Sequence, residues 1–155
     1  MRKFLAGMMC LVLLLASAAC SSNTEVKNPN LSDVIGEIRA AVEFPEMAEI
    51  KVADLPMYGY DLAPEDVAEM QFITAGSGFT ADEVVLIKLT DESKAEEVKK
   101  MAQTRRDGIA ETAQNYTPDE MEKLTTAVIG VKGPYVYYAA TNDNAKAKEI
   151  LTNAF

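Results

Sequence analysis

One stretch, Val84–Leu89 with the residues that follow it, most constrains the fold. It contains Val84-Val85-Leu86-Ile87, four consecutive apolar residues of which three are β-branched. Such runs are typical of strands that are buried on both faces. Asp91 is a favourable helix N-cap, and Glu92 would lie in the first turn, where the helix dipole stabilises negative charge. The sequence therefore predicts a central strand followed directly by a long helix.

The apolar residues of that helix recur near the helical period: Ala95, Val98, Ala102, Ile109, Ala113 and Tyr116. Arg105 falls on the same face. Its aliphatic stem can cover apolar surface while its guanidinium reaches a carboxylate. We prefer the interpretation that Arg105 forms a structural ion pair under the sheet. The alternative makes it a binding residue for an anion or a partner.

The N-terminal residues predict a signal peptide over residues 1–19. A short basic segment precedes an almost wholly apolar run from Phe4 to Leu15, and small residues lead to Cys20. The apolar run is too short for a comfortable transmembrane helix. Ser17-Ala18-Ala19-Cys20 resembles a bacterial lipobox, although that motif usually has leucine where Ser17 stands. We therefore expect cleavage before Cys20 and attachment of diacylglycerol to its sulfur.

Ordinary cleavage at Ala16-Ser17-Ala18 is the alternative, and it would give a secreted protein. Cys10 leaves with the signal, so Cys20 would then remain as one free thiol. Lipidation uses that thiol, so we prefer attachment to the outer face of the cytoplasmic membrane. Polar residues 20–30 are expected to form a tether, and residues 31–155 a single globular domain of ordinary size.

The charge of the chain limits its partners. The formal charge is −9, and it becomes −11 without residues 1–19, which carry two basic residues and no acidic one. Such a surface repels phosphate backbones and anionic lipid head groups, so nucleic acid is not an expected partner. Membrane attachment must then come from the N-terminal lipid rather than from a basic patch.

The remaining elements follow from local patterns. Asn30 or Ser32 caps a helix with Leu31, Val34, Ile35, Ile38 and Val42 on one face. The other expected elements are a strand at Met70–Ala75, a turn at Gly76-Ser77-Gly78, a helix capped by Thr117 with Glu120 completing a capping box, a hairpin with strands at Ala127–Val131 and Tyr135–Ala140, and a last helix capped by Asp143. Together they predict an α+β fold. The sheet should have about four antiparallel or mixed strands, with helices mainly on one face, and one parallel pair is possible.

Several segments resemble one family. They are Ala81-Asp82-Glu83-Val84, the helix through Arg105, Tyr116-Thr117-Pro118-Asp119-Glu120, Val131-Lys132-Gly133-Pro134-Tyr135-Val136, and Tyr58-Gly59-Tyr60-Asp61 with Pro64-Glu65-Asp66. The chain is similar over roughly Leu31–Phe155 to a family of small lipoproteins of unknown function that is common in Gram-positive anaerobes. The resemblance implies a lipoprotein with one compact domain, and it brings no activity.

Residue types argue against catalysis. The chain has no histidine, so the usual base at neutral pH is absent, and an acylated Cys20 leaves no cysteine ligand for a metal. We therefore expect no cofactor and no metal site. The carboxylate pairs Glu65-Asp66, Glu96-Glu97 and Asp119-Glu120 lie at helix starts or on charged faces, where solvation and dipole compensation explain them.

Tyr135 and Tyr137 should share one face of their strand, with Tyr138 on the other. Such tyrosines are usually core residues, but an exposed pair would suit an interface, so both join Arg105 as candidate partner-binding residues. The predicted function is a lipid-anchored extracytoplasmic binding or accessory module without catalysis, whose partner could be another envelope protein. The alternatives are a carboxylate-dependent hydrolytic enzyme and a small-ligand carrier of the envelope.

Overall fold

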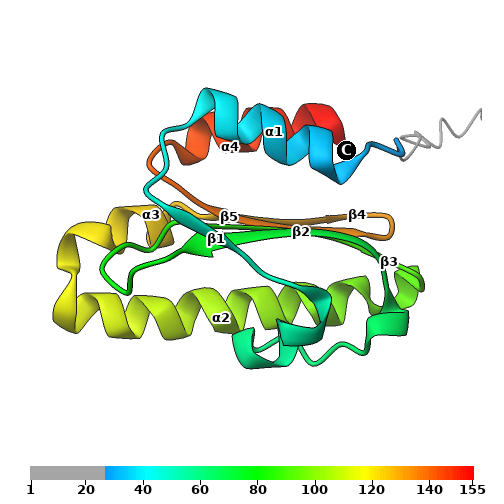
Figure 1. Cartoon of the computed structure of the whole chain (residues 1–155), viewed down its shortest axis with the longest axis horizontal. Helices are drawn as coiled ribbons and strands as arrows, with labels where there is room; N and C mark the ends of the chain where they lie inside the picture. The colour runs from blue at the N-terminus through cyan, green and yellow to red at the C-terminus, as the bar shows by residue number, and fades with distance from the viewer. Residues whose placement is uncertain (1–26) are drawn as a thin grey trace, which may run out of the picture.

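A five-stranded antiparallel sheet in the order β1-β2-β3-β5-β4 carries helices on both faces (Figure 1). The computed structural model describes residues 27–155, so the predicted signal peptide and Cys20 lie outside the described residues. The elements are α1 (Leu31–Ala41), β1 (Met47–Glu49), η1 (Val52–Tyr58), η2 (Pro64–Asp66), β2 (Val67–Ala75), β3 (Glu83–Leu89), η3 (Glu92–Lys94), α2 (Ala95–Tyr116), η4 (Pro118–Glu120), α3 (Met121–Thr125), β4 (Val128–Lys132), β5 (Tyr135–Ala140) and α4 (Asn144–Ala154).

β3 is the central strand, as its sequence predicts. Its side chains alternate between two separate apolar cores. Val85 and Ile87 face the core under α2, whereas Val84 and Leu86 face the core under α1 and α4. A strand that is apolar on both faces needs cover on both faces. The expectation of helices mainly on one face was therefore wrong: α2 and α3 lie on one side of the sheet, and α1 and α4 on the other (Figure 1).

The sheet has one strand more than the sequence indicates. β1 is only three residues long and lies at an edge, paired with the end of β2. A segment this short shows no clear alternation, so its pattern could not predict it. Every strand pairing is antiparallel, because β5 lies between β3 and β4 and separates the two strands that the α2–α3 connection joins.

Most predicted helix caps are present. Asn30, Asp91 and Asp143 each accept a hydrogen bond from a backbone N–H in the first turn of the helix that follows. Thr117 makes no such bond, so the predicted capping box was wrong. Its other member, Glu120, instead accepts a hydrogen bond from the backbone N–H of Ala81 at 2.8 Å, because it faces the sheet.

The predicted tether reaches the domain before Leu31. The Asn28 side-chain oxygen accepts hydrogen bonds from Lys88 Nζ at 2.7 Å and from the Tyr135 hydroxyl at 2.6 Å. Lys27 Nζ donates to the backbone oxygen of Asn153 at 2.6 Å. The chain therefore enters the fold beside the C-terminal helix.

Candidate functional site

Two adjacent carboxylates, Asp82 and Glu83, lie where the chain enters β3, and each is only 1% exposed. The two acids meet different helices: Glu83, the first residue of β3, meets Arg105 of α2, and Asp82, just before the strand, meets Lys123 of α3. A buried charge is tolerated when it is paired and hydrogen-bonded, and both pairs meet that condition.

Glu83 and Arg105 form a bidentate pair. Arg105 Nε donates to Glu83 Oε1 at 2.6 Å, and Nη2 donates to Oε2 at 2.5 Å. The third nitrogen, Nη1, has only a long contact of 3.4 Å with the backbone oxygen of Tyr58. Burial alone would lower the pKa of Arg105, but the hydrogen bonds and charge of Glu83 raise it above its usual range. The guanidinium therefore stays charged, as the preferred sequence interpretation expects.

Aromatic rings surround this pair. The Arg105 guanidinium lies 4.8 Å from the centre of the Tyr58 ring and 5.8 Å from that of Phe72. Burial, followed by the Glu83 charge, raises the pKa of both Tyr60 and Tyr138. Neither tyrosine hydroxyl has a hydrogen-bond partner within the described part of the chain. The ion pair is thus held in apolar surroundings, where each polar atom without a partner costs stability.

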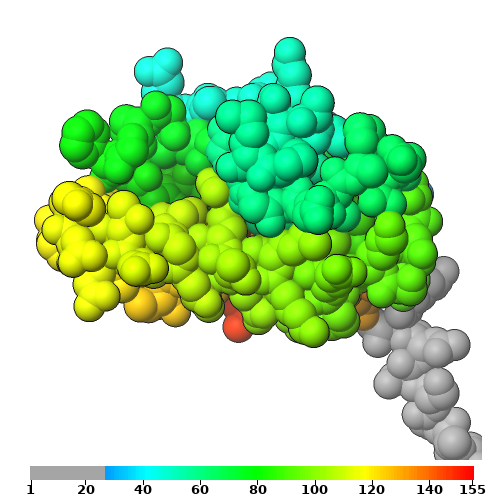
Figure 2. Space-filling view, turned by 90° about the horizontal axis from the view of Figure 1, so that it is seen from below, coloured from blue at the N-terminus to red at the C-terminus, as the bar shows by residue number. Residues whose placement is uncertain are grey.

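A hollow of about 520 Å³ opens beside Arg105, between η1, the β2–β3 loop and α2. These three segments meet on the face that Figure 2 shows, in teal, green and yellow-green. Among residues 27–155, Glu83 and Arg105 are the charged residues that line it. Six small hydroxyl side chains also line it: Thr74, Ser77, Thr80, Thr104, Thr112 and Thr117. The Thr80 hydroxyl is buried and has no hydrogen-bond partner.

Three exposed apolar residues belong to the segments that form this hollow. Met57 is 83% exposed, Phe79 76% and Tyr116 81%, and these are the large hydrophobic residues most open to solvent within residues 27–155. Met57 lines the hollow directly, and Phe79 and Tyr116 are each next to a lining residue in the chain. Tyr116 was expected on the buried stripe of the long helix, and that was wrong, because α2 ends there. Single exposed hydrophobic residues are ordinary on a protein surface, but these three come from η1, the β2–β3 loop and the end of α2, the same segments that line the hollow.

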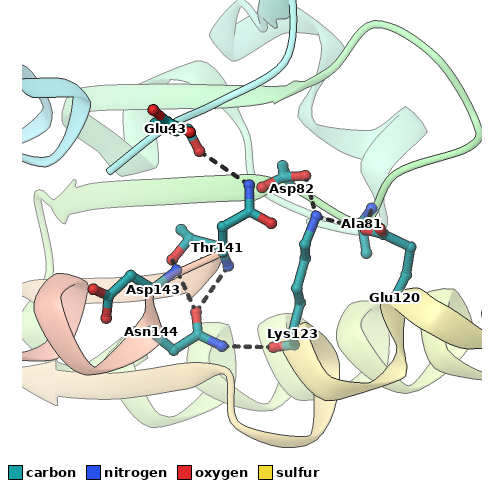
Figure 3. A network of polar contacts seen from close by, with 9 residues as sticks. Glu43, Ala81, Asp82, Glu120, Lys123, Thr141, Asp143 and Asn144 are labelled. Carbon is teal, nitrogen blue, oxygen red and sulfur yellow. Dashed lines mark hydrogen bonds and ion pairs between the residues drawn. The ribbon is translucent and has the colours of Figure 1, made fainter. Parts of the chain in front are cut away.

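A second ion cluster ties α3 to the sheet (Figure 3). Lys123 Nζ lies 2.7 Å from Asp82 Oδ2 and 2.8 Å from Glu120 Oε2. Burial raises the pKa of Asp82 above its usual range, although Lys123 donates to it. Burial also opposes ionisation of Glu120, but hydrogen bonds from Lys123 and the Ala81 backbone hold its pKa below its usual range. Both carboxylates thus contact one ammonium group. This cluster of Asp82, Glu120 and Lys123, here called the clasp, connects η4 and α3 to the start of β3.

Asn144 continues this polar region toward α4. Its amide nitrogen donates to the backbone oxygen of Lys123 and to the hydroxyl of Thr126, both at 2.8 Å. Its side-chain oxygen accepts from the backbone N–H of Thr141 at 2.8 Å (Figure 3). Asn142 also donates from its side chain to the backbone oxygen of Glu43 at 3.1 Å. These contacts satisfy the Asn144 side chain and fix the start of the C-terminal helix against the end of α3.

The predicted site residues separate in the structure. Arg105 lines the hollow, but Tyr135 and Tyr137 lie on the opposite face of the sheet, under α4. Tyr135 is 1% exposed, so it forms part of the core and offers no exposed ring. Tyr137 is half-buried and stacks on Phe155 with ring centres 5.4 Å apart and an interplanar angle of 3°. The two tyrosines do share a face, as expected, with Tyr138 in the other core.

Sequence reasoning missed Asp82 and Glu83. It began the predicted strand at Val84, and it weighed the carboxylate pairs Glu65-Asp66, Glu96-Glu97 and Asp119-Glu120 instead. One signal was available: two acids directly precede an apolar run, with no turn residue between them and the strand. Glu83 also falls in the alternation of Val85, Ile87 and Leu89, which places it on the side that faces α2.

Residues 40–141 match the family model described as a domain of unknown function, DUF4358. The chain belongs to this family. The match supports the domain-of-unknown-function part of the sequence resemblance. The DUF4358 region contains the hollow and both ion clusters, whereas most of α1 and all of α4 lie outside it. No curated protein and no solved structure gives a significant match to the chain.

Two searches of residues 27–155 bear on metals and membranes. No group of three or more His, Cys, Asp and Glu side chains in that range is arranged to hold a metal ion. No helix in the same range combines the length and the apolar character of a membrane span.

Proposed function

We propose that this DUF4358 protein is a lipid-anchored, extracytoplasmic, non-catalytic binding module, and that the hollow beside Arg105 is its binding site. One observation carries the proposal. The hollow measures about 520 Å³, its two charged lining residues neutralise each other, and exposed Met57 stands at its rim. This is the composition of a recognition site: concave, partly apolar, with a few fixed polar groups.

The charges in the hollow are poorly suited to catalysis. General acid–base catalysis needs a group that can exchange a proton with a substrate near the working pH. Glu83 is engaged by two short hydrogen bonds from Arg105, and the pKa of Arg105 is raised. Both Glu83 oxygens are thus occupied by the guanidinium, which favours binding over chemistry at this site.

A carboxylate-dependent hydrolase is the second candidate, and one observation favours it. The pKa values of Asp82 and Glu120 are displaced in opposite directions, as in a catalytic acid and base. The Asp82 side chain is fully buried, however, and Lys123 contacts both carboxylates. A substrate would have to displace Lys123 to reach Asp82, so we rank this function second. A small-ligand carrier would use the same hollow, but the six hydroxyl side chains suit polar ligands better than apolar cargo.

The anchor in this proposal rests on the N-terminal sequence. The apolar signal segment, the small residues before Cys20 and the polar residues after it support a lipid on the Cys20 sulfur, and thus a place on the outer face of the cytoplasmic membrane. Mass spectrometry of the mature N-terminus tests this directly. A diacylglyceryl group on Cys20 is expected, with Cys20→Ala as the control. An unmodified N-terminus at Ala19 would contradict it.

Site-specific photo-crosslinking in cells tests the binding proposal. A photoreactive phenylalanine analogue placed at Phe79 should label one envelope component reproducibly, because this exposed ring lies beside the hollow. Glu37 is the matched control: it is exposed on α1, which covers the other face of the sheet. Labelling that is the same from both positions would contradict a binding site at the hollow.

A further inference from the structure

We infer that the hollow beside Arg105 takes an uncharged, hydroxyl-rich ligand of the saccharide class, of about two or three sugar rings. This inference rests on the proposed binding function and names the chemistry of its ligand. Charge, hydrogen-bonding capacity and exposed ring surface each narrow the choice.

Charge excludes ionic ligands first. A bound anion would lie close to the Glu83 carboxylate as well as to Arg105, and a bound cation would lie close to the guanidinium. Each would gain one attraction and one repulsion of similar size. The formal charge of −9 for the chain further disfavours anions. A neutral ligand incurs neither repulsion, so it is the one that this pair accommodates.

Hydrogen-bonding capacity then favours hydroxyl groups. Six serine and threonine hydroxyls line the hollow, and a hydroxyl can both donate and accept. The Thr112 hydroxyl already donates to the backbone oxygen of Gly108 at 3.2 Å, so it can only accept from a ligand. The Thr80 hydroxyl is buried without a partner, and Arg105 Nη1 is engaged only by the long contact to Tyr58. A ligand hydroxyl can accept from the guanidinium and donate to a neighbouring oxygen at once. An apolar ligand would leave these groups desolvated and unpaired, which costs binding energy.

Exposed ring surface supplies the third argument. Tyr58 lines the hollow itself, and Phe79 and Tyr116 are exposed aromatic residues that adjoin lining residues in the chain. The C–H face of a pyranose ring stacks on such surfaces, while its hydroxyls project at the edges toward polar groups. Small-ligand sites usually measure about 300–1,000 Å³, and the hollow of about 520 Å³ lies within that range.

Titration with named neutral saccharides tests the inference. The probes are N,N′-diacetylchitotriose and maltotriose, with glucose 6-phosphate as an anionic comparison and the uncharged peptide acetyl-Ala-Tyr-Ala-amide as a peptide comparison. The chain is used as the cell produces it, in a detergent without a sugar head group, and binding is measured by calorimetry. Saturable binding of at least one neutral trisaccharide is expected, with weaker or no binding of the phosphate.

Thr80→Val gives the sharpest variant, because it removes a hydroxyl at nearly constant shape. Its affinity for the bound trisaccharide should fall about tenfold, the usual effect of one lost hydrogen bond. Its melting temperature should not fall, because the lost hydroxyl has no partner in the unliganded protein. Phe79→Ala should also weaken binding, whereas Glu37→Ala, on the far side of the sheet, should leave it unchanged.

Two results would overturn the inference. One is the absence of binding by both trisaccharides, and the other is trisaccharide binding that Thr80→Val and Phe79→Ala leave intact. Binding of the uncharged peptide instead, sensitive to the same variants, would replace the saccharide with a peptide ligand and leave the proposed binding function standing. The crosslinking experiment at Phe79 tests the binding function separately. If the photoreactive residue at Phe79 labels no more than the one at Glu37, the binding function itself is contradicted.

Discussion

The two faces of the sheet differ in how they are closed. The face under α1 and α4 is closed by apolar side chains and by Phe155, which packs against Tyr135 and Tyr137 with ring centres 4.9 and 5.4 Å away. The face under α2 contains the buried Glu83–Arg105 pair and two tyrosine hydroxyls without partners, and it opens into the hollow. Closing a fold with apolar side chains costs less free energy than closing it with a buried ion pair. The polar features of the α2 face therefore support the proposal that this face has a binding role in addition to its role in folding.

The family match includes the α2 face of the sheet and leaves out most of the helices that cover the other face. Residues 40–141 contain the whole of α2, the hollow and the five strands, and they leave out most of α1 and all of α4. The shared region thus includes the face that contains the buried charges. We therefore expect substitutions on the α2 face to respond to charge and ligand, and substitutions on the α1–α4 face to respond only to packing.

The largest effect is expected for Arg105→Met. Methionine retains much of the packing but leaves the Glu83 carboxylate, 1% exposed, without its partner. An uncompensated buried charge typically costs about 3–5 kcal/mol of unfolding free energy. Arg105→Lys keeps the charge but loses the planar fork, so it should cost less. Urea unfolding of the soluble 22–155 chain measures both. An unchanged midpoint for Arg105→Met would show that the pair contributes nothing to folding.

Ile38→Ala tests the opposite face. Ile38 of α1 is fully buried in the apolar core under α1 and α4. Shortening a buried isoleucine to alanine costs about 2–5 kcal/mol through lost transfer energy and the cavity left behind. Because no charge is involved, this loss should be the same in low and high salt, unlike that of Arg105→Met. Glu37→Ala on the exposed side of α1 serves as the control. A strong salt dependence for Ile38→Ala would contradict the claim that the α1–α4 face responds only to packing.

What the sequence predicts well is local. The apolar run of β3, the caps Asn30, Asp91 and Asp143, and the β4–β5 hairpin each depend on residues close together in the chain, and all are present. Arg105 was placed on the sheet-facing side of its helix by the same spacing. Most strands and helices could therefore be found without the tertiary structure, and the three-residue β1 is the strand that was missed.

What the sequence predicts poorly depends on distant contacts. Glu83 is buried because Arg105, 22 positions later, reaches it, and Asp82 because Lys123, 41 positions later, does. The local pattern places Glu83 on the side of β3 that faces α2, but it does not show which distant residue pairs with either acid. The hollow likewise joins η1, the β2–β3 loop and α2, whose order in the chain does not show that they meet. The capping box at Thr117 failed for the same reason, because Glu120 found a better partner in the backbone of Ala81.

Gly130→Ala is expected to have a smaller effect, on the α1–α4 side. Gly130 pairs with Tyr137 across the β4–β5 hairpin, and a Cβ at Gly130 would overlap the Tyr137 ring. The ring would have to leave its stack on Phe155. Such overpacking typically costs about 1–3 kcal/mol. Gly36→Ala in α1 is the matched control, since a Cβ there meets no neighbouring atom and alanine favours the helix. Thermal unfolding that ranks the two variants the other way would contradict this account.

Asp82→Asn tests the effect of acid on the clasp at α3. Because burial raises the pKa of Asp82 in the folded protein, folding takes up a proton at Asp82 as the pH falls toward the ordinary aspartate value of about 3.9. This group therefore adds stability as the pH falls and removes it as the pH rises through the folded pKa. The amide of the Asp82→Asn variant takes up no such proton, so the stability advantage of the wild type over this variant should grow between pH 7 and pH 4. Urea unfolding at both pH values measures the difference. An advantage that shrinks with acid would show that Lys123 outweighs burial.

The smallest effect is expected for Tyr60→Phe, and its sign is the informative part. The Tyr60 hydroxyl is buried near the Glu83–Arg105 pair and has no hydrogen-bond partner. Removing a buried polar atom that makes no bond should leave the unfolding free energy unchanged or raise it by up to about 1 kcal/mol. Tyr135→Phe on the other face is the matched comparison, because the Tyr135 hydroxyl donates to Asn28 at 2.6 Å and its loss should destabilise the protein. A clear destabilisation by Tyr60→Phe would mean that its hydroxyl has a partner, such as a buried water near Glu83. The α2 face would then have fewer buried polar atoms without hydrogen bonds than its contacts indicate, and it would differ less from the α1–α4 face.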